Sequence, residues 1–335
     1  MHAEHHLAAP SPAYLNFLAA VARLPLREAG PLALRLHIPS FAGDLEPAGA
    51  LETYLGYLKR EATMHAVLFA GMGTVTGLSF DGNGPGSLAE RDLDSLLAHL
   101  RRHFRFADRE VSDHEAVLDS GQAAPGRLAR LRALGFSRIR YDLDPGCADA
   151  DLLVELVPAA RAVGFRSVSV ALPYGAPEQG FDQLRAMLRA VVAAAPDCVL
   201  PRHRPGARRE ADAIIPGSVA QRMRQLCGDH LDIARYTGRG VDGDIRHRKE
   251  AADDRWSGAE RRRETMPGSH LGARLVGCGV GARAAFGALA CRNVGALYDY
   301  YALLDRNELP VAQLARREQT EPYLMQVKDF RDANQ

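Results

Sequence analysis

The feature that most constrains the fold is an alternation of short apolar runs with longer helical patterns through residues 32–201. Four of the runs are typical of strands: LALRLHI, TVTGLSF, SRIRYDL and RSVSVALPYG. Each run is followed by a helical pattern, at 50–67, 88–104, 150–164 and 179–194 respectively. In the second pattern Leu93, Leu96, Leu97 and Leu100 share one helical face. Such an alternation predicts an α/β protein with a parallel sheet and outer helices, either open or closed as a barrel.

Composition narrows the class of partner. The chain has 335 residues, and its 42 basic and 41 acidic side chains leave a net charge of +1. This balance argues against binding to nucleic acid or anionic membranes through overall charge. No signal-peptide pattern or long apolar run is present, and the five cysteines are too scattered for a disulfide framework. We expect a cytoplasmic monomer with no nucleic-acid or membrane partner.

A basic stretch at 201–265 interrupts the pattern with RHRPGARR, RHRKE and RRRE. Its apolar periodicity is weak, so we expect a solvated, loop-rich insertion. Nucleic-acid binding would need interleaved aromatic residues, and this stretch has only Tyr236 and Trp256. The expected organisation is an N-terminal segment at 1–28, a barrel at 29–305 containing this insertion, and a short tail at 306–335.

Several segments in order carry a family resemblance. The string LALRLHIPSFAGDLEPAG resembles the cluster-binding segment of the oxygen-independent coproporphyrinogen III oxidases, radical S-adenosylmethionine enzymes of haem biosynthesis. In that family the strand ends in HIPFC, and a CxxxCxxC motif holds a 4Fe-4S cluster. LSFDGNGPGSL is similar to the family's strand and GGGTP loop, AVGFRSVSVALPYGAPEQ to its GFxxxNIDLIYGLPxQ strand, and VGCGVGARA to its LGxGVSAI turn. The resemblance implies a partial (β/α) TIM-like barrel of the radical S-adenosylmethionine type.

The resemblance also implies where the S-adenosylmethionine pocket would lie. The matching positions are His37, Gly82, Gly84, Pro85, Glu115, Tyr174, Gly175, Pro177, Gln179, Gly277 and Gly279. The acidic residue of the family's third strand falls on His114, or on Glu115 if one gap is allowed. Candidates to pair with porphyrin carboxylates are Arg35, Arg202 and Arg204, because guanidinium groups bind carboxylates in a bidentate manner.

The departures from the family pattern bear on function. The three cluster-cysteine positions fall on Phe41, Leu45 and Ala48, and no Cys or His lies between His37 and His65. A 4Fe-4S cluster needs thiolate ligands, so this loop cannot bind one. We also expect the family's C-terminal lid domain to be missing. We therefore expect neither the cluster nor S-adenosylmethionine to be retained, no metal site, and a pseudoenzyme that binds a tetrapyrrole or a partner in haem metabolism.

Two alternatives stay open. In the first, the chain remains an active coproporphyrinogen III dehydrogenase whose cluster is held by other cysteines, such as Cys147, Cys278 and Cys291. In the second, Gly277 and Gly279 form a dinucleotide-binding turn with Asp299 at the position of the ribose-binding acid. Whether the chain is an enzyme is not decided by the sequence.

Overall fold

The computed structural model describes residues 10–23, 31–41, 49–71, 73–82, 84–119, 122–145, 152–204, 217–239, 245–248, 274–286 and 289–316. The chain folds into two compact units. The first unit comprises Met1–Gly84, Leu88–Ser112 and His270–Gln335, and the second comprises Pro85–Ser87 and Asp113–Ser269.

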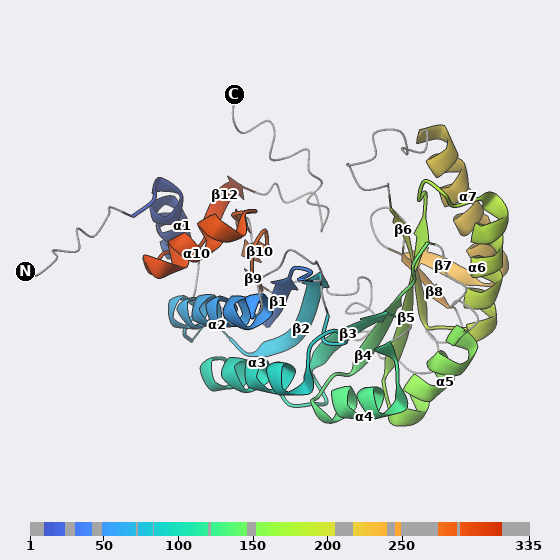
Figure 1. Ribbon diagram of the computed structural model, residues 1–335, viewed down its shortest axis with the longest axis horizontal. Helices are drawn as coiled ribbons and strands as arrows, with labels where there is room; N and C mark the ends of the chain where they lie inside the picture. Colours follow the sequence, from blue (N-terminus) through green and yellow to red (C-terminus); the bar gives the residue numbers. More distant parts are fainter. Residues whose placement is uncertain are drawn as a thin grey trace, which may run out of the picture. The chain divides into compact units, whose positions relative to one another are not determined.

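The first unit is built on a mixed sheet in which β1 is parallel to both of its neighbours, β2 and β9. Three antiparallel pairings then extend the sheet from β9 through β10 and β11 to β12. Its strands are β1 (Leu32–Ile38), β2 (Val75–Gly82), β9 (Arg274–Cys278), β10 (Arg283–Phe286), β11 (Leu289–Asn293) and β12 (Val311–Arg316) (Figure 1). Its helices are α1 (Pro12–Ala22), α2 (Ala50–Leu68), α3 (Glu90–His103) and α10 (Leu297–Asp305).

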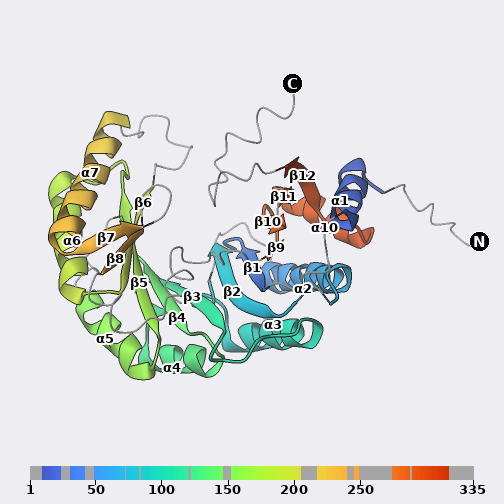
Figure 2. The ribbon, with the colours of Figure 1, turned by 180° about the vertical axis from the view of Figure 1, so that it is seen from behind.

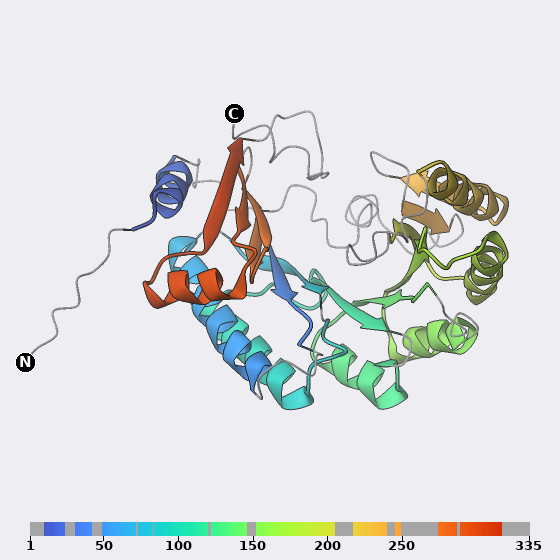
Figure 3. The ribbon, with the colours of Figure 1, turned by 45° about the horizontal axis from the view of Figure 1, so that its top comes forward.

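Helices α2 and α3 pack on each other, and each buries one face of side chains. The predicted leucine stripe is confirmed, because Leu93, Leu96, Leu97 and Leu100 are all buried on α3. Helix α2 buries a face that includes the ionisable side chains of Glu61 and His65. Figure 3 shows α10 lying next to α2, and the two helices are in contact. A buried carboxyl group on this face requires hydrogen-bond donors from the neighbouring elements.

The second unit follows the predicted β/α alternation. Strands β3 (Asp113–Asp119), β4 (Arg138–Asp142), β5 (Ser167–Tyr174) and β6 (Cys198–His203) are parallel, and the hairpin of β8 (Ile245–Arg248) and β7 (Tyr236–Arg239) continues the sheet from β6. The helices are α4 (Pro125–Ala133), α5 (Leu153–Val163), α6 (Phe181–Ala194) and α7 (Gly217–Ile233), and Figure 2 shows them along one face of the strands.

Side chains along β4 alternate between the two faces of the sheet, with an aromatic residue on one face and arginines on the other. The hydroxyl of Tyr141 donates to the carbonyl oxygen of Leu156 on α5 over 3.3 Å, so this side chain faces the helices. Successive residues of a strand point to opposite faces, which puts Arg138 and Arg140 on the other face. Both arginines are buried.

Two expectations about organisation need correction. The stretch at 201–265 is not loop-rich throughout, because 217–233 forms helix α7, whose buried side chains recur every three or four residues among arginines: Ala220, Met223, Cys227 and Leu231. The sheet also continues past residue 305, since β12 pairs with β11 and contacts α1. Residues 205–216 and 249–273 lie outside the described part of the chain. No described helix is both long and apolar enough to cross a bilayer.

Candidate functional site

The carboxyl ends of β1, β2 and β9 bring three predicted positions of the first unit together. Ile38 stands opposite Gly82 in the β1–β2 register, and Leu36 stands opposite Cys278, the residue before Gly279. The hydroxyl of Tyr54 on α2 donates to the carbonyl oxygen of His37 over 2.5 Å and accepts from the backbone N–H of Val280 over 3.1 Å. The strand ends and the Gly279 turn therefore meet at one edge of the sheet, as the resemblance implies.

Gly279 has no room for a side chain. Its φ is +114°, and a Cβ atom there would lie 2.3 Å from the carbonyl oxygen of His37 and 2.6 Å from the hydroxyl of Tyr54. Gly277 is equally confined, because its Cβ would lie 2.1 Å from the carbonyl oxygen of Arg283. Both glycines are thus required by close backbone contacts within the protein.

A buried carboxyl group fixes this turn. One oxygen of Glu61, Oε2, accepts from the N–H of Gly279 and from the hydroxyl of Tyr300, each over 2.7 Å. The other oxygen, Oε1, accepts from the amide of Asn293 over 2.6 Å, and the same amide donates to the carbonyl oxygen of Gly279 over 2.8 Å. Burial, followed by the nearby charge of Glu61, raises the pKa of Tyr300 well above its ordinary value. These contacts join α2, α10 and the β9–β11 region.

The residues at the predicted cluster positions do not fit a 4Fe-4S cluster. The ring of Phe41 lies 5.4 Å from the ring of Tyr54, so an aromatic contact occupies the place of the first cysteine. Leu45 and Ala48 lie outside the described residues, but neither side chain can ligate iron. The donor set of this loop therefore has no thiolate to offer.

Charged side chains gather at this same edge of the first unit. The Nε atom of Arg35 lies 3.8 Å from an Asp81 carboxylate oxygen, and Arg283 stands opposite Arg292 in the β10–β11 register. Burial and the charges of Arg292 and Arg35 lower the pKa of Arg283, against the raising effect of Asp81. Arg35 and Arg283 thus both lie close enough to Asp81 to feel its charge, and Arg292 acts on Arg283. Sequence reasoning selected Arg35 and missed Arg283 and Arg292, although both follow closely on the glycine turn.

In the second unit the predicted residues after β5 also come together. The Gln179 side chain accepts from the N–H of Gly175 over 2.9 Å and donates to the carbonyl oxygen of Pro173 over 3.0 Å. Pro177 lies in the same turn. The ring of Tyr174 lies 5.5 Å from the ring of His203, and the N–H of Arg204 donates to the Tyr174 carbonyl oxygen over 2.9 Å. These positions shape a turn, which is what their residue types indicate.

Arg202 and Arg204 are exposed at the end of β6. Burial, followed by the nearby charges of Asp144 and Asp142, raises the pKa of Asp119. The charge of Arg204 opposes this rise, so Arg204 lies near that carboxyl group. This edge of the second unit therefore presents carboxylates beside its arginines. It is a poorer match to an anionic ligand than the arginine-rich edge of the first unit.

Glu115 belongs to an ion-pair network. Its Oε2 atom lies 3.0 Å from Arg140 Nη1, and Arg140 Nε lies 2.8 Å from Asp142 Oδ1. The neighbouring Arg138 pairs with Asp113 over 3.3 Å. Register places Glu115 opposite Arg138 on the adjacent strand. The family's acidic position is thus neutralised by arginines that the sequence comparison did not select.

The remaining predicted positions have structural contacts. Gly84 and Pro85 are buried, and the carbonyl oxygen of Pro85 accepts a hydrogen bond from Arg127. His114, the alternative to Glu115, is also buried.

The structure bears differently on the two alternative site assignments. A dinucleotide-binding turn opens a helix in a βαβ unit, but here the turn at Gly279 leads to β10, which pairs antiparallel with β9, and Asp299 lies on α10. That prediction is wrong, because the turn belongs to a β-hairpin. Among the cysteines, burial raises the pKa of Cys291 to about 12 and that of Cys278 well above its ordinary value. Cys147 lies outside the described residues.

Comparisons with known proteins agree with this geometry. No family model matches the chain. It is 28% identical over 318 residues to the oxygen-independent coproporphyrinogen III oxidase of Pseudomonas aeruginosa, covering 85% of this chain and 68% of the relative. The enzyme of the same name from Escherichia coli K12 is 28% identical over 320 residues, covering 86% and 68%. The solved structure of the Escherichia coli coproporphyrinogen III oxidase HemN, a radical SAM enzyme, superimposes with a TM-score of 0.73 at 24% identity, over 91% of this chain and 75% of that one.

The fold, with its parallel β/α units and the glycine turn beside β1, is therefore the TIM-like fold of the radical S-adenosylmethionine enzymes. Within that class, the chain is a homologue of the oxygen-independent coproporphyrinogen III oxidases.

Proposed function

We propose that this chain is a pseudoenzyme: a coproporphyrinogen III oxidase homologue that has lost the cluster and its radical chemistry, and that binds a tetrapyrrole through carboxylates. The observation that carries the loss of the cluster is the Phe41 ring packed against Tyr54 at the position of the first cysteine. The proposal includes a cytoplasmic location, in keeping with scattered cysteines that lack disulfide spacing.

The proposed ligand class follows from charge. Arg283 feels the charges of both Arg35 and Arg292 at the edge where β1 ends, and Asp81 supplies a carboxylate beside Arg35 and Arg283. Like charges at close range repel, and an added carboxylate would relieve that repulsion while accepting bidentate hydrogen bonds. A coproporphyrin carries several carboxylates and a wide apolar ring. We propose that at least one of those carboxylates binds beside these arginines.

Anaerobic reconstitution with iron and sulfide tests the loss of the cluster. We expect no broad iron–sulfur absorbance and at most about one iron per chain, without sulfide, in the reconstituted protein. Incorporation of about four irons per chain would overturn the proposal and support an active enzyme with other ligands. Substitution of Cys147, Cys278 and Cys291 would then identify the ligands.

Fluorescence titration with coproporphyrin III tests the ligand. We expect saturable binding that Arg283→Gln and Arg292→Gln each weaken by about tenfold, because a charge-assisted hydrogen bond contributes about 1.5–3 kcal/mol. Arg102→Gln is the control, since Arg102 is an exposed arginine in the last turn of α3. Equal affinity in all three variants, or no saturable binding, would contradict the proposed tetrapyrrole ligand.

A further inference from the structure

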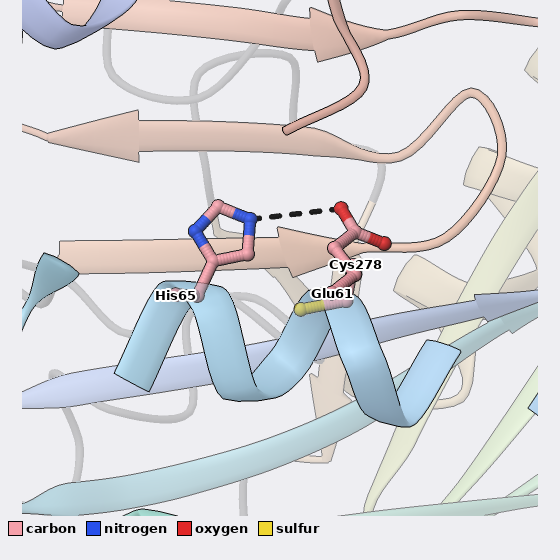
Figure 4. Close-up of side chains that lie close together, drawn as sticks. All are labelled: Glu61, His65 and Cys278. Carbon is pink, nitrogen blue, oxygen red and sulfur yellow. Dashed lines mark ion pairs between the residues drawn. The ribbon is translucent and has the colours of Figure 1, made fainter. Parts of the chain in front are cut away.

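A separate cluster of donor side chains lies between α2 and β9. Glu61 and His65 are four residues apart on α2 and so share one helix face, and Cys278 ends β9. One potential ligand atom from each residue lies within 4.8 Å of the other two, and all three residues are buried. Figure 4 shows these side chains gathered beside the helix, with the ion pair between His65 and Glu61. Among the residues that the structure describes, this is the single grouping of three such donors.

His65 carries the first argument for a ligand. Its exposed fraction is 2%, yet neither Nδ1 nor Nε2 has a hydrogen-bond partner within the described structure. The ring stacks on Phe69 with an interplanar angle of 5°, which fixes its orientation. A buried imidazole with both nitrogens unsatisfied costs free energy. A metal ion bound to Nε2 would remove part of that cost.

Glu61 has coordination capacity left. Its Oε2 atom already accepts two hydrogen bonds, from Gly279 and Tyr300, whereas Oε1 accepts one, from Asn293. The Oε1 atom lies 3.6 Å from His65 Nε2. A carboxylate oxygen has two lone pairs, so Oε1 can ligate an ion while Asn293 continues to orient it.

We propose that Glu61, His65 and Cys278 form a binding site for one divalent ion of the zinc class. Zinc accepts nitrogen, sulfur and oxygen ligands together, with bonds of about 2.0–2.3 Å, whereas magnesium and calcium prefer oxygen alone. The 3.6 Å between Nε2 and Oε1 is near the spacing of about 3.4 Å that two such ligands have in a tetrahedral site. Water would provide the fourth ligand.

Charge balance supports a divalent ion. On binding, the sulfur of Cys278 bonds to the metal and its proton leaves for solvent, with no change of oxidation state. The carboxylate and the thiolate then offset the two positive charges, and neutral imidazole adds none. A buried site without net charge avoids most of the desolvation penalty that an isolated ion would incur. The bound ion would fasten α2 to β9, and this role is independent of tetrapyrrole binding.

The test uses the full chain, freed of metal with a chelator and then titrated with Co²⁺ and Zn²⁺. We expect one Co²⁺ ion per chain, with tetrahedral visible bands and a thiolate-to-cobalt charge-transfer band that Zn²⁺ removes. Cys278→Ser should abolish the charge-transfer band. It should also weaken Zn²⁺ binding at least about 100-fold, since even substitutions beyond the ligands cost about 10–100-fold.

His65→Gln is the second variant, and it should weaken binding similarly while leaving the Cys278 thiol in place. Cys291→Ser is the matched control, because Cys291 is a buried cysteine on β11 of the same sheet and lies outside the donor group. Circular dichroism checks that each variant is folded. Wild-type affinity in both Cys278→Ser and His65→Gln, or cobalt bands without a thiolate transition, would overturn the proposal.

Discussion

Two glycine turns, one in each unit, are held in place by different kinds of side-chain contact. Gly279 after β9 and Gly175 after β5 both have positive φ angles, +114° and +82°. Each backbone N–H is held by a side-chain oxygen: Glu61 holds Gly279, and Gln179 holds Gly175. The first partner is 218 residues away and carries a carboxyl group, whereas the second is four residues away and neutral.

The difference separates local turn chemistry from tertiary assembly. The turn at Gly175 can form from its own loop, because Gln179 bonds both the N–H of Gly175 and the carbonyl oxygen of Pro173. The turn at Gly279 needs α2, α10 and β11 in place, since Glu61, Tyr300 and Asn293 all take part. The stability of the first unit should therefore depend on its turn far more than that of the second unit does.

The largest expected effect comes from removing the two side chains that hold the turns. Glu61→Ala leaves the N–H of Gly279, one N–H of the Asn293 amide and the hydroxyl of Tyr300 without an acceptor. Each such loss costs about 1–3 kcal/mol, so we expect the free energy of unfolding to fall by more than about 3 kcal/mol. Gln179→Ala should cost about 2 kcal/mol. Urea denaturation of the metal-free protein measures the stability of both variants. Equal losses in Glu61→Ala and Gln179→Ala would contradict the proposed difference between the two turns.

Replacing the glycines themselves should give the next effect. Gly279→Ala puts a methyl group 2.3 Å from a backbone oxygen, that of His37, which cannot move without disturbing β1. Gly175→Ala meets the His203 ring at 2.6 Å, and that exposed side chain can rotate away. In urea denaturation we expect the free energy of unfolding to fall by about 3 kcal/mol for Gly279→Ala and by about 1–2 kcal/mol for Gly175→Ala. A Gly175→Ala variant as unstable as Gly279→Ala would show that both turns are rigid.

Tyr54→Phe should have a smaller effect on the first unit. The substitution keeps the ring but removes a donor to the His37 carbonyl oxygen and an acceptor for the Val280 N–H. The expected loss is about 1–2 kcal/mol in the free energy of unfolding. Tyr57→Phe on the same helix is the control, because the Tyr57 hydroxyl contacts only the exposed Asp305 among the hydrogen bonds described, and it should cost under about 0.5 kcal/mol. Equal thermal or urea midpoints for the two variants would argue against the Tyr54 contacts.

The smallest expected effect is in the titration of His37 beside the first turn. Burial lowers the pKa of His37, and Asp81 opposes that shift. The folded state then binds fewer protons than the unfolded state, so the His37 contribution to stability is present at neutral pH and declines as pH falls below about 6.5. NMR titration of the imidazole proton should give a pKa below 6.5.

Asp81→Asn should lower the pKa of His37 further, because it removes the charge that raises it. An unchanged or raised pKa in Asp81→Asn would show that the carboxylate does not act on His37. The urea-unfolded protein supplies the reference value for both forms.

The sequence by itself determined the elements whose causes are local. Apolar runs and helical spacing predicted β1, β4, β5, α2 and α3, and the stripe of Leu93, Leu96, Leu97 and Leu100 predicted the buried face of α3. The turn at Gly175 and Gln179 was also predictable from its residue types and spacing. The sequence likewise showed that Phe41, Leu45 and Ala48 cannot ligate iron, because side-chain chemistry does not depend on the fold.

Only the tertiary structure decided which distant residues meet. Helix α2 carries Glu61 and His65 to the end of β9, where Cys278 and Gly279 lie more than two hundred residues further along the chain. Register alone brings Arg283 opposite Arg292 and links Glu115 to the arginines of β4. Helical and strand periodicities report which side chains are buried, but they carry no information about which buried groups share a contact. That information arises when the sheet forms, because strand order and register fix the distances between segments that the sequence keeps apart.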